Sequence, residues 1–110
     1  MSTPFAVSAE QTSERTVLHA RGEIDTSTAA ILTDALARDS GAPVVVIDLT
    51  EVTFLASAGL AVLVAANQRT RTTGQRLITV SPPGSAVRRA IAAASLDHVL
   101  ALAEDRTTAV

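Results

Sequence analysis

The sequence predicts a single small α/β domain, in which strands alternate with helices around one sheet. The first observation is the β-branched run at residues 44–49, which is typical of a central strand buried on both faces. The second is the helical spacing of apolar residues in segments 58–69 and 87–94. The third is composition: 47% of the 110 residues are apolar. A chain of this length can bury about 65% of its unfolded surface, so we expect one domain over residues 1–110.

The other elements follow from local patterns along the chain. Apolar and polar residues alternate in a first short strand at 5–9, and a second β-rich run covers 16–24. Helix formers at 29–38 follow three candidate capping residues, Asp25, Ser27 and Thr28. The i,i+4 spacing places Ile31 with Ala35 and Leu32 with Leu36 on the apolar stripe of that helix. The rest of the chain is expected as a loop at 50–56, a helix at 57–72, a strand at 75–80, a helix around 87–94, an edge strand within 96–102 and a frayed tail at 103–110, so that the core covers about 5–102.

Absent residue types exclude most catalytic chemistry. The sequence contains no cysteine and no lysine, which removes thiolate nucleophiles, cysteine-based zinc sites and Schiff-base catalysis. Only His19 and His98 can supply an imidazole. Asp48 and Glu51 lie near the end of the central strand, but no third ligand accompanies them, so we expect solvated or turn-capping carboxylates rather than a metal site.

Charge and hydropathy exclude further classes. The net charge is −2 with acids and arginines scattered, and only 2% of the residues are aromatic, so no nucleic-acid surface is expected. The longest apolar stretch, at 58–66, is too short to span a bilayer. The N-terminal residues lack the basic and apolar regions of a signal peptide. We therefore expect a cytoplasmic protein without membrane insertion.

Two motifs carry a resemblance to a known family. The segment at 48–63, DLTEVTFLASAGLAVL, resembles the signature of STAS domains, and within them the bacterial anti-sigma factor antagonists. Their pattern is a strand ending in Asp-Leu-Ser, a Phe-aliphatic pair, and Asp-Ser-Ser-Gly-Leu opening a helix. The segment at 22–29 is similar to the family's Gly-Glu-Leu-Asp…Thr-Ala turn. The resemblance covers about residues 5–102 and implies a mixed sheet of four or five strands with helices packed mainly on one face.

The resemblance also implies a function, namely partner switching in transcription regulation, for example in a stress response. The unphosphorylated protein would bind an anti-sigma factor that is a serine kinase, and phosphorylation at Ser57 would release it. A serine phosphatase would reverse the modification. No catalytic residue, cofactor or metal is implied. The implied partner-binding residues are Asp25, Thr26, Ser27, Thr28, Ala56, Ser57, Ala58, Gly59, Leu60 and Leu63.

Ser57 also stands out on physical grounds. It lies where a loop becomes a helix, so its hydroxyl is expected to cap the amides of residues 58–60, and a phosphate there would meet the positive end of the helix dipole. A plain helix cap is the alternative interpretation. Two positions depart from the family pattern: Ala56 replaces the usual Asp, and Ala58 replaces the usual second hydroxyl residue. The second departure leaves Ser57 as the sole acceptor in its loop.

Two other functions compete with partner switching. A STAS regulatory subunit of a membrane transporter or sensing complex would use the same fold without sigma-factor control. A small serine hydrolase would use Ser57 with His98 and either Asp97 or Asp105. Against the hydrolase, Leu55 occupies the first glycine position of the Gly-x-Ser-x-Gly motif.

Overall fold

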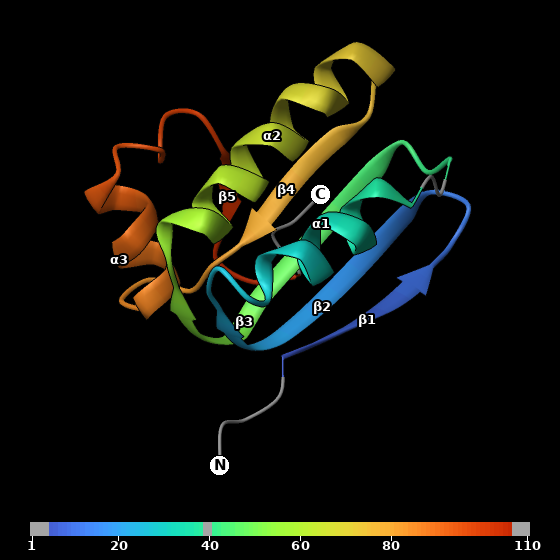
Figure 1. The fold of residues 1–110 in the computed structure, drawn as a ribbon. Helices are drawn as coiled ribbons and strands as arrows, with labels where there is room; N and C mark the ends of the chain where they lie inside the picture. The colour runs from blue at the N-terminus through green and yellow to red at the C-terminus, as the bar shows by residue number, and fades with distance from the viewer. Residues whose placement is uncertain (1–4, 39–40, 107–110) are drawn as a thin grey trace.

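The fold is a five-stranded mixed sheet with three helices (Figure 1). The structure is a computed structural model that describes residues 5–38 and 41–106. The sheet order is β1-β2-β3-β4-β5, with β1 antiparallel to β2 and all other neighbouring pairs parallel. The elements are β1 Ala6–Gln11, β2 Arg15–Ile24, α1 Ala29–Ala37, β3 Val44–Leu55, α2 Ser57–Thr73, β4 Arg76–Val80, α3 Ala86–Ala93 and β5 Ala101–Ala103. The α/β fold class predicted from the sequence is confirmed.

The helices pack mainly over one face of the sheet, as expected. In Figure 1, α1 and α2 lie side by side across this face, and α3, which packs against β3, lies apart from them. The main core joins Leu32 of α1, Leu63 of α2 and Ile91 of α3 to the sheet residues Ile47 and Leu49, all of them fully buried. The opposite face carries a smaller buried cluster of Val17, Val46, Ile78, Val80 and Ala103.

Strand β3 is longer than the sequence predicted. The expected loop at 50–56 is wrong, because β3 continues to Leu55 and stays paired with β2. The register shifts twice, between His19 and Arg21 and between Gly22 and Glu23, which places extra residues in β3. These irregularities break the period-2 pattern that a strand normally shows, and the segment therefore resembled a loop in the sequence.

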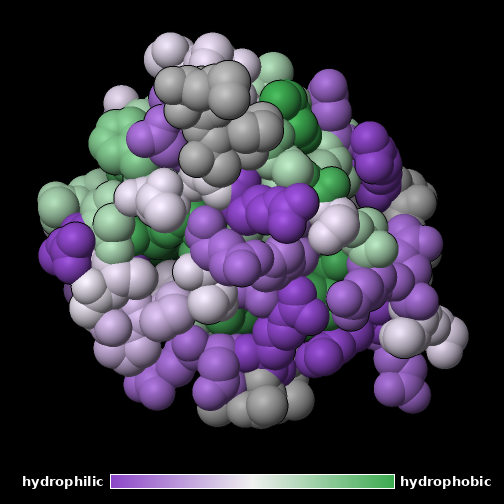
Figure 2. Space-filling view, turned by 90° about the horizontal axis from the view of Figure 1, so that it is seen from below, coloured by the Kyte–Doolittle hydropathy of each residue, from purple (hydrophilic) through white to green (hydrophobic). Residues whose placement is uncertain are grey.

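The predicted helices are present, and one residue of the predicted apolar stripe of α1 faces outward. Leu32 and Ala35 are buried and Leu36 is half-buried, as predicted, but Ile31 is 45% exposed. Together with Phe54 and Val99, Ile31 is one of three exposed large apolar residues in the described part of the chain. Figure 2 shows the molecule from below, where hydrophilic residues gather over the centre and lower part of the view and hydrophobic residues lie mainly toward its upper and left margins.

The C-terminal segment is more ordered than a frayed tail from 103 would be. Ala103 belongs to β5, and the side chain of Arg106 reaches back to Asp48 on β3. Residues 107–110, the remainder of the expected tail, lie outside the described residues.

Candidate functional site

The two motifs meet at one end of the sheet. Strands β2 and β3 are parallel and pair Ile24 with Leu55, so the turns that follow them leave the sheet together (Figure 1). The backbone amide of Ala56 donates to the carbonyl of Ile24 over 2.8 Å, which ties the two turns to each other. The adjacency of the Asp25 turn and the Ser57 turn follows from this pairing.

Ser57 is the first residue of α2, and it does not cap the helix as predicted. Ala56 occupies the N-cap position with an extended backbone, φ −81° and ψ 170°, and its carbonyl accepts from the amides of Gly59 and Leu60. The cap position falls one residue earlier because β3 runs directly to Leu55. The Ser57 side chain is therefore exposed, and its hydroxyl has no hydrogen-bond partner within residues 5–38 and 41–106.

The start of α2 offers unused backbone donors beside this hydroxyl. No residue of the described chain accepts a hydrogen bond from the amides of Ser57 and Ala58. The first turn of α2 also carries no acidic residue. A negative group on Ser57 would meet two free amides and the positive end of the helix dipole without a competing carboxylate in that turn.

The neighbouring turn is ordered by Asp25. Its carboxylate accepts from the amide and hydroxyl of Ser27, at 2.9 and 2.7 Å, and from the amide of Thr28 at 3.0 Å. The hydroxyl of Thr28 donates to the carbonyl of Glu23. The Ser27 hydroxyl and the Thr28 amide are the main causes that hold the pKa of Asp25 below its usual value. Thr28 occupies the N-cap position of α1, but its side chain forms no capping hydrogen bond. The carboxylate of Asp25 instead accepts from the backbone amides just before the helix, those of Ser27 and Thr28. Thr26 and Ser27 remain exposed at the tip of the turn.

Two predicted partner-binding residues face the core instead of the surface. Leu63 is fully buried in the main core, so its side chain does not reach the surface. Gly59 is buried against Leu55 and Ile24, and a Cβ atom on it would lie 2.6 Å from Cγ2 of Ile24. Both residues face inward because they lie four positions apart, on the side of α2 that packs against the sheet. Ala56, Ala58 and Leu60 are half-buried and remain at the surface.

Phe54 is a surface residue that sequence reasoning left out of the candidate site. Phe54 lies three residues before Ser57 and pairs with Glu23 on β2. Its side chain is 49% exposed. The motif contains this phenylalanine, but a large aromatic residue in a buried strand is normally expected to pack inward. Only the register shift in β3 turns it outward.

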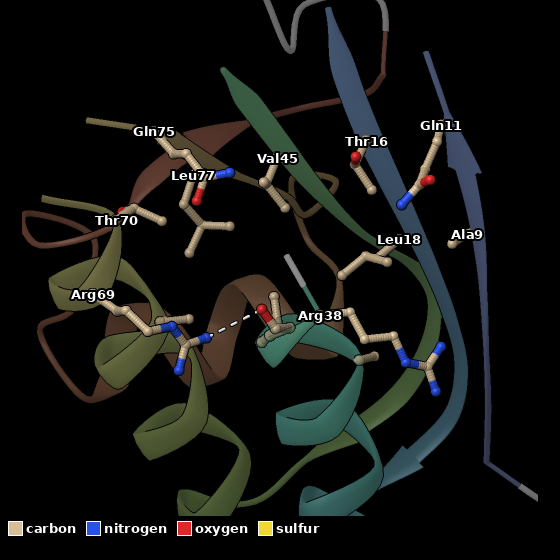
Figure 3. A pocket seen from close by; sticks show the side chains of 13 residues that line it. Ala9, Gln11, Thr16, Leu18, Arg38, Val45, Arg69, Thr70, Gln75 and Leu77 are labelled. Carbon is tan, nitrogen blue, oxygen red and sulfur yellow. Dashed lines mark hydrogen bonds between the residues drawn. The ribbon is translucent and has the colours of Figure 1, made fainter. Parts of the chain in front are cut away.

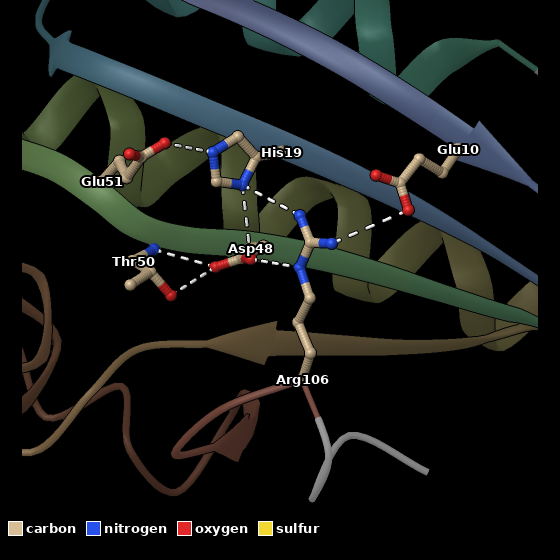
Figure 4. Close-up of polar contacts among 6 residues, drawn as sticks. All are labelled: Glu10, His19, Asp48, Thr50, Glu51 and Arg106. Carbon is tan, nitrogen blue, oxygen red and sulfur yellow. Dashed lines mark hydrogen bonds and ion pairs between the residues drawn. The ribbon is translucent and has the colours of Figure 1, made fainter.

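A second polar cluster lies on the face of the sheet that the helices leave open (Figure 4). Asp48 is only 3% exposed and accepts from the amide of Thr50 and from Nε of Arg106. His19 contacts Asp48, Glu51 and a terminal nitrogen of Arg106. The expected solvated or turn-capping role is thus wrong for Asp48, which is buried and accepts from the amide of Thr50 within the same strand, β3. Glu51 is exposed and contacts His19.

Hydrogen bonding controls the charge of Asp48. Burial raises the pKa of its carboxyl group, but hydrogen bonds from Thr50, Arg106 and His19 outweigh burial and lower the pKa to about 2. The same contact raises the pKa of Arg106. No sequence signal indicates this ion pair, because its two residues are 58 positions apart.

The described residues do not form the serine-hydrolase site or a metal site. His98 is exposed between α3 and β5, and no contact joins it to Ser57 within the described residues. Residues 5–38 and 41–106 contain no group of three histidine, aspartate or glutamate side chains placed to hold a metal ion. None of the helices described is both long and apolar enough to cross a bilayer.

Comparison with known proteins identifies the family. The family described as "Mlab, STAS domain" matches residues 7–103. An anti-sigma factor antagonist from Mycobacterium paratuberculosis shares 32% identity, with a TM-score of 0.81 over 99% of this chain and 95% of that protein. A putative anti-sigma factor antagonist from Thermotoga maritima shares 16% identity, with a TM-score of 0.78 over 92% of this chain and 88% of that one.

The phosphorylated form of SpoIIAA, a Bacillus cell fate determinant, is also similar. It shares 17% identity, with a TM-score of 0.67 over 89% of this chain and 91% of that protein. The Thermotoga and Bacillus proteins share too little sequence to indicate more than a common fold. The family match over most of the chain, joined to the strand order and the two adjacent motif turns, leads to one conclusion: the chain belongs to the STAS domain family.

Proposed function

We propose that this protein is an anti-sigma factor antagonist that acts by partner switching in the cytoplasm. In its unphosphorylated form it binds an anti-sigma factor that is a serine kinase, so that a sigma factor becomes free to start transcription. The main support is the exposed, unbonded hydroxyl of Ser57 at the start of α2. The similarity to the Mycobacterium paratuberculosis antagonist supports the general role.

The modification fits the chemistry of this turn. The kinase transfers the γ-phosphoryl group of ATP to Oγ of Ser57: the new P–O bond forms, the bond to the leaving ADP oxygen breaks, and the hydroxyl proton passes to a base on the kinase. A phosphoserine adds a charge of about −1.5 to −2. The amides of Ser57 and Ala58 are available to donate hydrogen bonds to the phosphate oxygens. A serine phosphatase then returns the protein to its binding form.

The partner surface surrounds Ser57. It consists of the Asp25–Thr28 turn, the small residues Ala56 and Ala58, and the half-buried Leu60. Small side chains let a partner helix approach closely, and Leu60 supplies an apolar contact. Gly59 and Leu63 support this surface from beneath. A phosphate at its centre would place an unpaired charge in the contact, which weakens binding.

The direct test uses a kinase-type anti-sigma factor encoded in the same genome. Incubation with ATP is expected to add one phosphate, detected by mass spectrometry, and Ser57→Ala is expected to abolish it. Thr53→Ala is the matched control, because Thr53 is exposed but its hydroxyl donates to the carbonyl of Gly22. Ser57→Asp is expected to weaken kinase binding. A phosphate located on Thr53 or on the buried Ser81 would contradict the assignment.

A regulatory subunit of a membrane transporter or sensing complex is the second candidate. Ala56 and Ala58 depart from the family's phosphorylation motif, and this favours a partner that binds without a phosphate cycle. In that case affinity purification would recover a stable complex, and Ser57→Asp would weaken it only through the added charge. A kinase-dependent release of the partner would exclude this function.

A further inference from the structure

A cavity lies at the end of the sheet opposite Ser57 (Figure 3). Its floor is formed near the beginnings of β2, β3 and β4, whereas Ser57 follows the end of β3. The C-terminal parts of α1 and α2 form the roof. The apolar lining consists of Ala9, Leu18, Ala35, Leu36, Val45, Ala66 and Leu77, and the polar lining of Gln11, Thr16, Arg38, Arg69, Thr70 and Gln75.

Thr16 gives this cavity an unmet hydrogen-bonding group. The residue is 4% exposed, and its hydroxyl oxygen has no hydrogen-bond partner. Within the described residues it is the one buried side-chain polar atom in this condition. A buried hydroxyl without a partner destabilises the fold, so a molecule that bonds to it from the cavity would be favoured.

The charge of the lining indicates an anion. Arg38 and Arg69 lie at the rim, and no described acidic residue lines the cavity. Arg69 donates through one terminal nitrogen to the carbonyl of Leu36 over 3.2 Å, which leaves its other guanidinium donors for a ligand. Arg38 forms no ion pair with any described residue. Arginine at such a position suits a carboxylate, because its planar group donates two parallel hydrogen bonds.

The volume of the cavity limits the size of the ligand that it can hold. Its volume is about 50 Å³. At roughly 10–15 Å³ for each water, this is the space of about four water molecules. An open hollow of about 410 Å³ adjoins it and shares Leu36, Arg38, Arg69 and Gln75. A short hydrocarbon chain therefore fits the inner cavity while its charged end stays at the arginine rim.

We propose that this cavity binds a short-chain carboxylate that carries an oxo or hydroxyl group. Arg38 and Arg69 hold the carboxylate, and Leu18, Val45 and Leu77 contact the hydrocarbon. The hydroxyl of Thr16 bonds to the second oxygen of the ligand. This site is separate from the Ser57 surface and does not depend on partner switching.

Two probes of equal length test the hydrogen bond to Thr16. We expect 4-oxopentanoate to bind about fivefold to tenfold more tightly than pentanoate, measured by backbone amide shifts at residues 16, 18, 45 and 77. Thr16→Val keeps the side-chain shape, and it is expected to remove this difference without lowering the melting temperature of the free protein. Arg38→Gln is expected to weaken the binding of both carboxylates by about the same factor.

Matched controls separate the outcomes. Ser57→Ala should bind both probes as the natural sequence does, and pentylamine should not bind. Equal binding of the two carboxylates with no effect of Thr16→Val would overturn the role of Thr16. Binding of pentylamine as tight as that of pentanoate would overturn the carboxylate specificity. The absence of any saturable shift at these amides would mean that the cavity holds only water.

Discussion

Gly59 in the first turn of α2 lies directly against Ile24 at the end of β2, with room for a hydrogen atom but not for a methyl group. A Cβ atom at position 59 would also strike the side chain of Leu55. This close approach brings the start of α2 down onto the ends of two parallel strands. The Ser57 turn and the Asp25 turn are thereby supported on one packed base.

Gly59→Ala is therefore expected to lower the free energy of unfolding by about 1–3 kcal/mol, because Ile24 is β-branched and its Cγ2 cannot move aside freely. Urea unfolding measures this change. Ala61→Glu, on an exposed position of the same helix, is the control and should be close to neutral. Unchanged stability of the Gly59 variant would mean that the strand ends relax around the new methyl group.

Leu60 and Leu63 are expected to respond differently to truncation. Leu63→Ala should cost about 2–5 kcal/mol of stability, because the side chain is fully buried in the main core. Leu60→Ala should cost less stability and weaken kinase binding at least about tenfold, because Leu60 is half-buried and lies on the proposed partner surface. Calorimetric titration and urea unfolding of both variants check this. Kinase binding of Leu60→Ala at the natural affinity would remove Leu60 from the surface.

Ala56→Asp is expected to stabilise the protein. The backbone of Ala56 already has the extended conformation of an N-cap residue, and an Asp side chain there can accept from the free amide of Ala58. The gain should be about 0.5–2 kcal/mol, seen as a higher melting temperature. The same change is expected to weaken kinase binding by about 1–3 kcal/mol, because it places an unpaired charge in the contact.

Ala56→Asn separates these two effects, because asparagine caps equally well without the charge. It should raise the melting temperature and leave kinase binding closer to that of the natural sequence. If neither variant alters binding, position 56 lies outside the partner surface.

Asp48 is expected to control acid stability. The pKa of its carboxyl group is about 2 in the folded chain, compared with the ordinary value of 3.8 expected for the unfolded chain. Folding therefore favours the ionised form. This contribution is fully present above about pH 4 and is lost as the pH falls through about 2. A shift of this size corresponds to at most about 2 kcal/mol. Urea unfolding between pH 2 and pH 7 measures it.

Asp48→Asn is the matched variant, because it keeps the shape and removes the charge that Arg106 contacts. It should be less stable at neutral pH and lose stability less steeply between pH 4 and pH 2. An acid profile parallel to that of the natural sequence would show that Asp48 does not carry this dependence. Arg106→Gln should weaken the same dependence, since it removes one of the hydrogen bonds that lower the pKa.

The sequence by itself determined the order of the elements and the fold class. Local periods of apolar residues depend on neighbours a few positions apart, so the central strand and the three helices could be predicted. These predictions needed no knowledge of which distant residues touch.

Only the tertiary structure decided which side chains face the partner surface and which face the core. The register shifts of β3 against β2 turn Phe54 outward, and the packing of α2 against the sheet buries Gly59 and Leu63. The ion pair of Asp48 and Arg106 joins positions 58 residues apart. The hydroxyl of Thr16 is buried without a partner beside a cavity that residues of α1 and α2 also line. In each case the physical reason is strand register or packing between distant segments, which a local pattern does not contain.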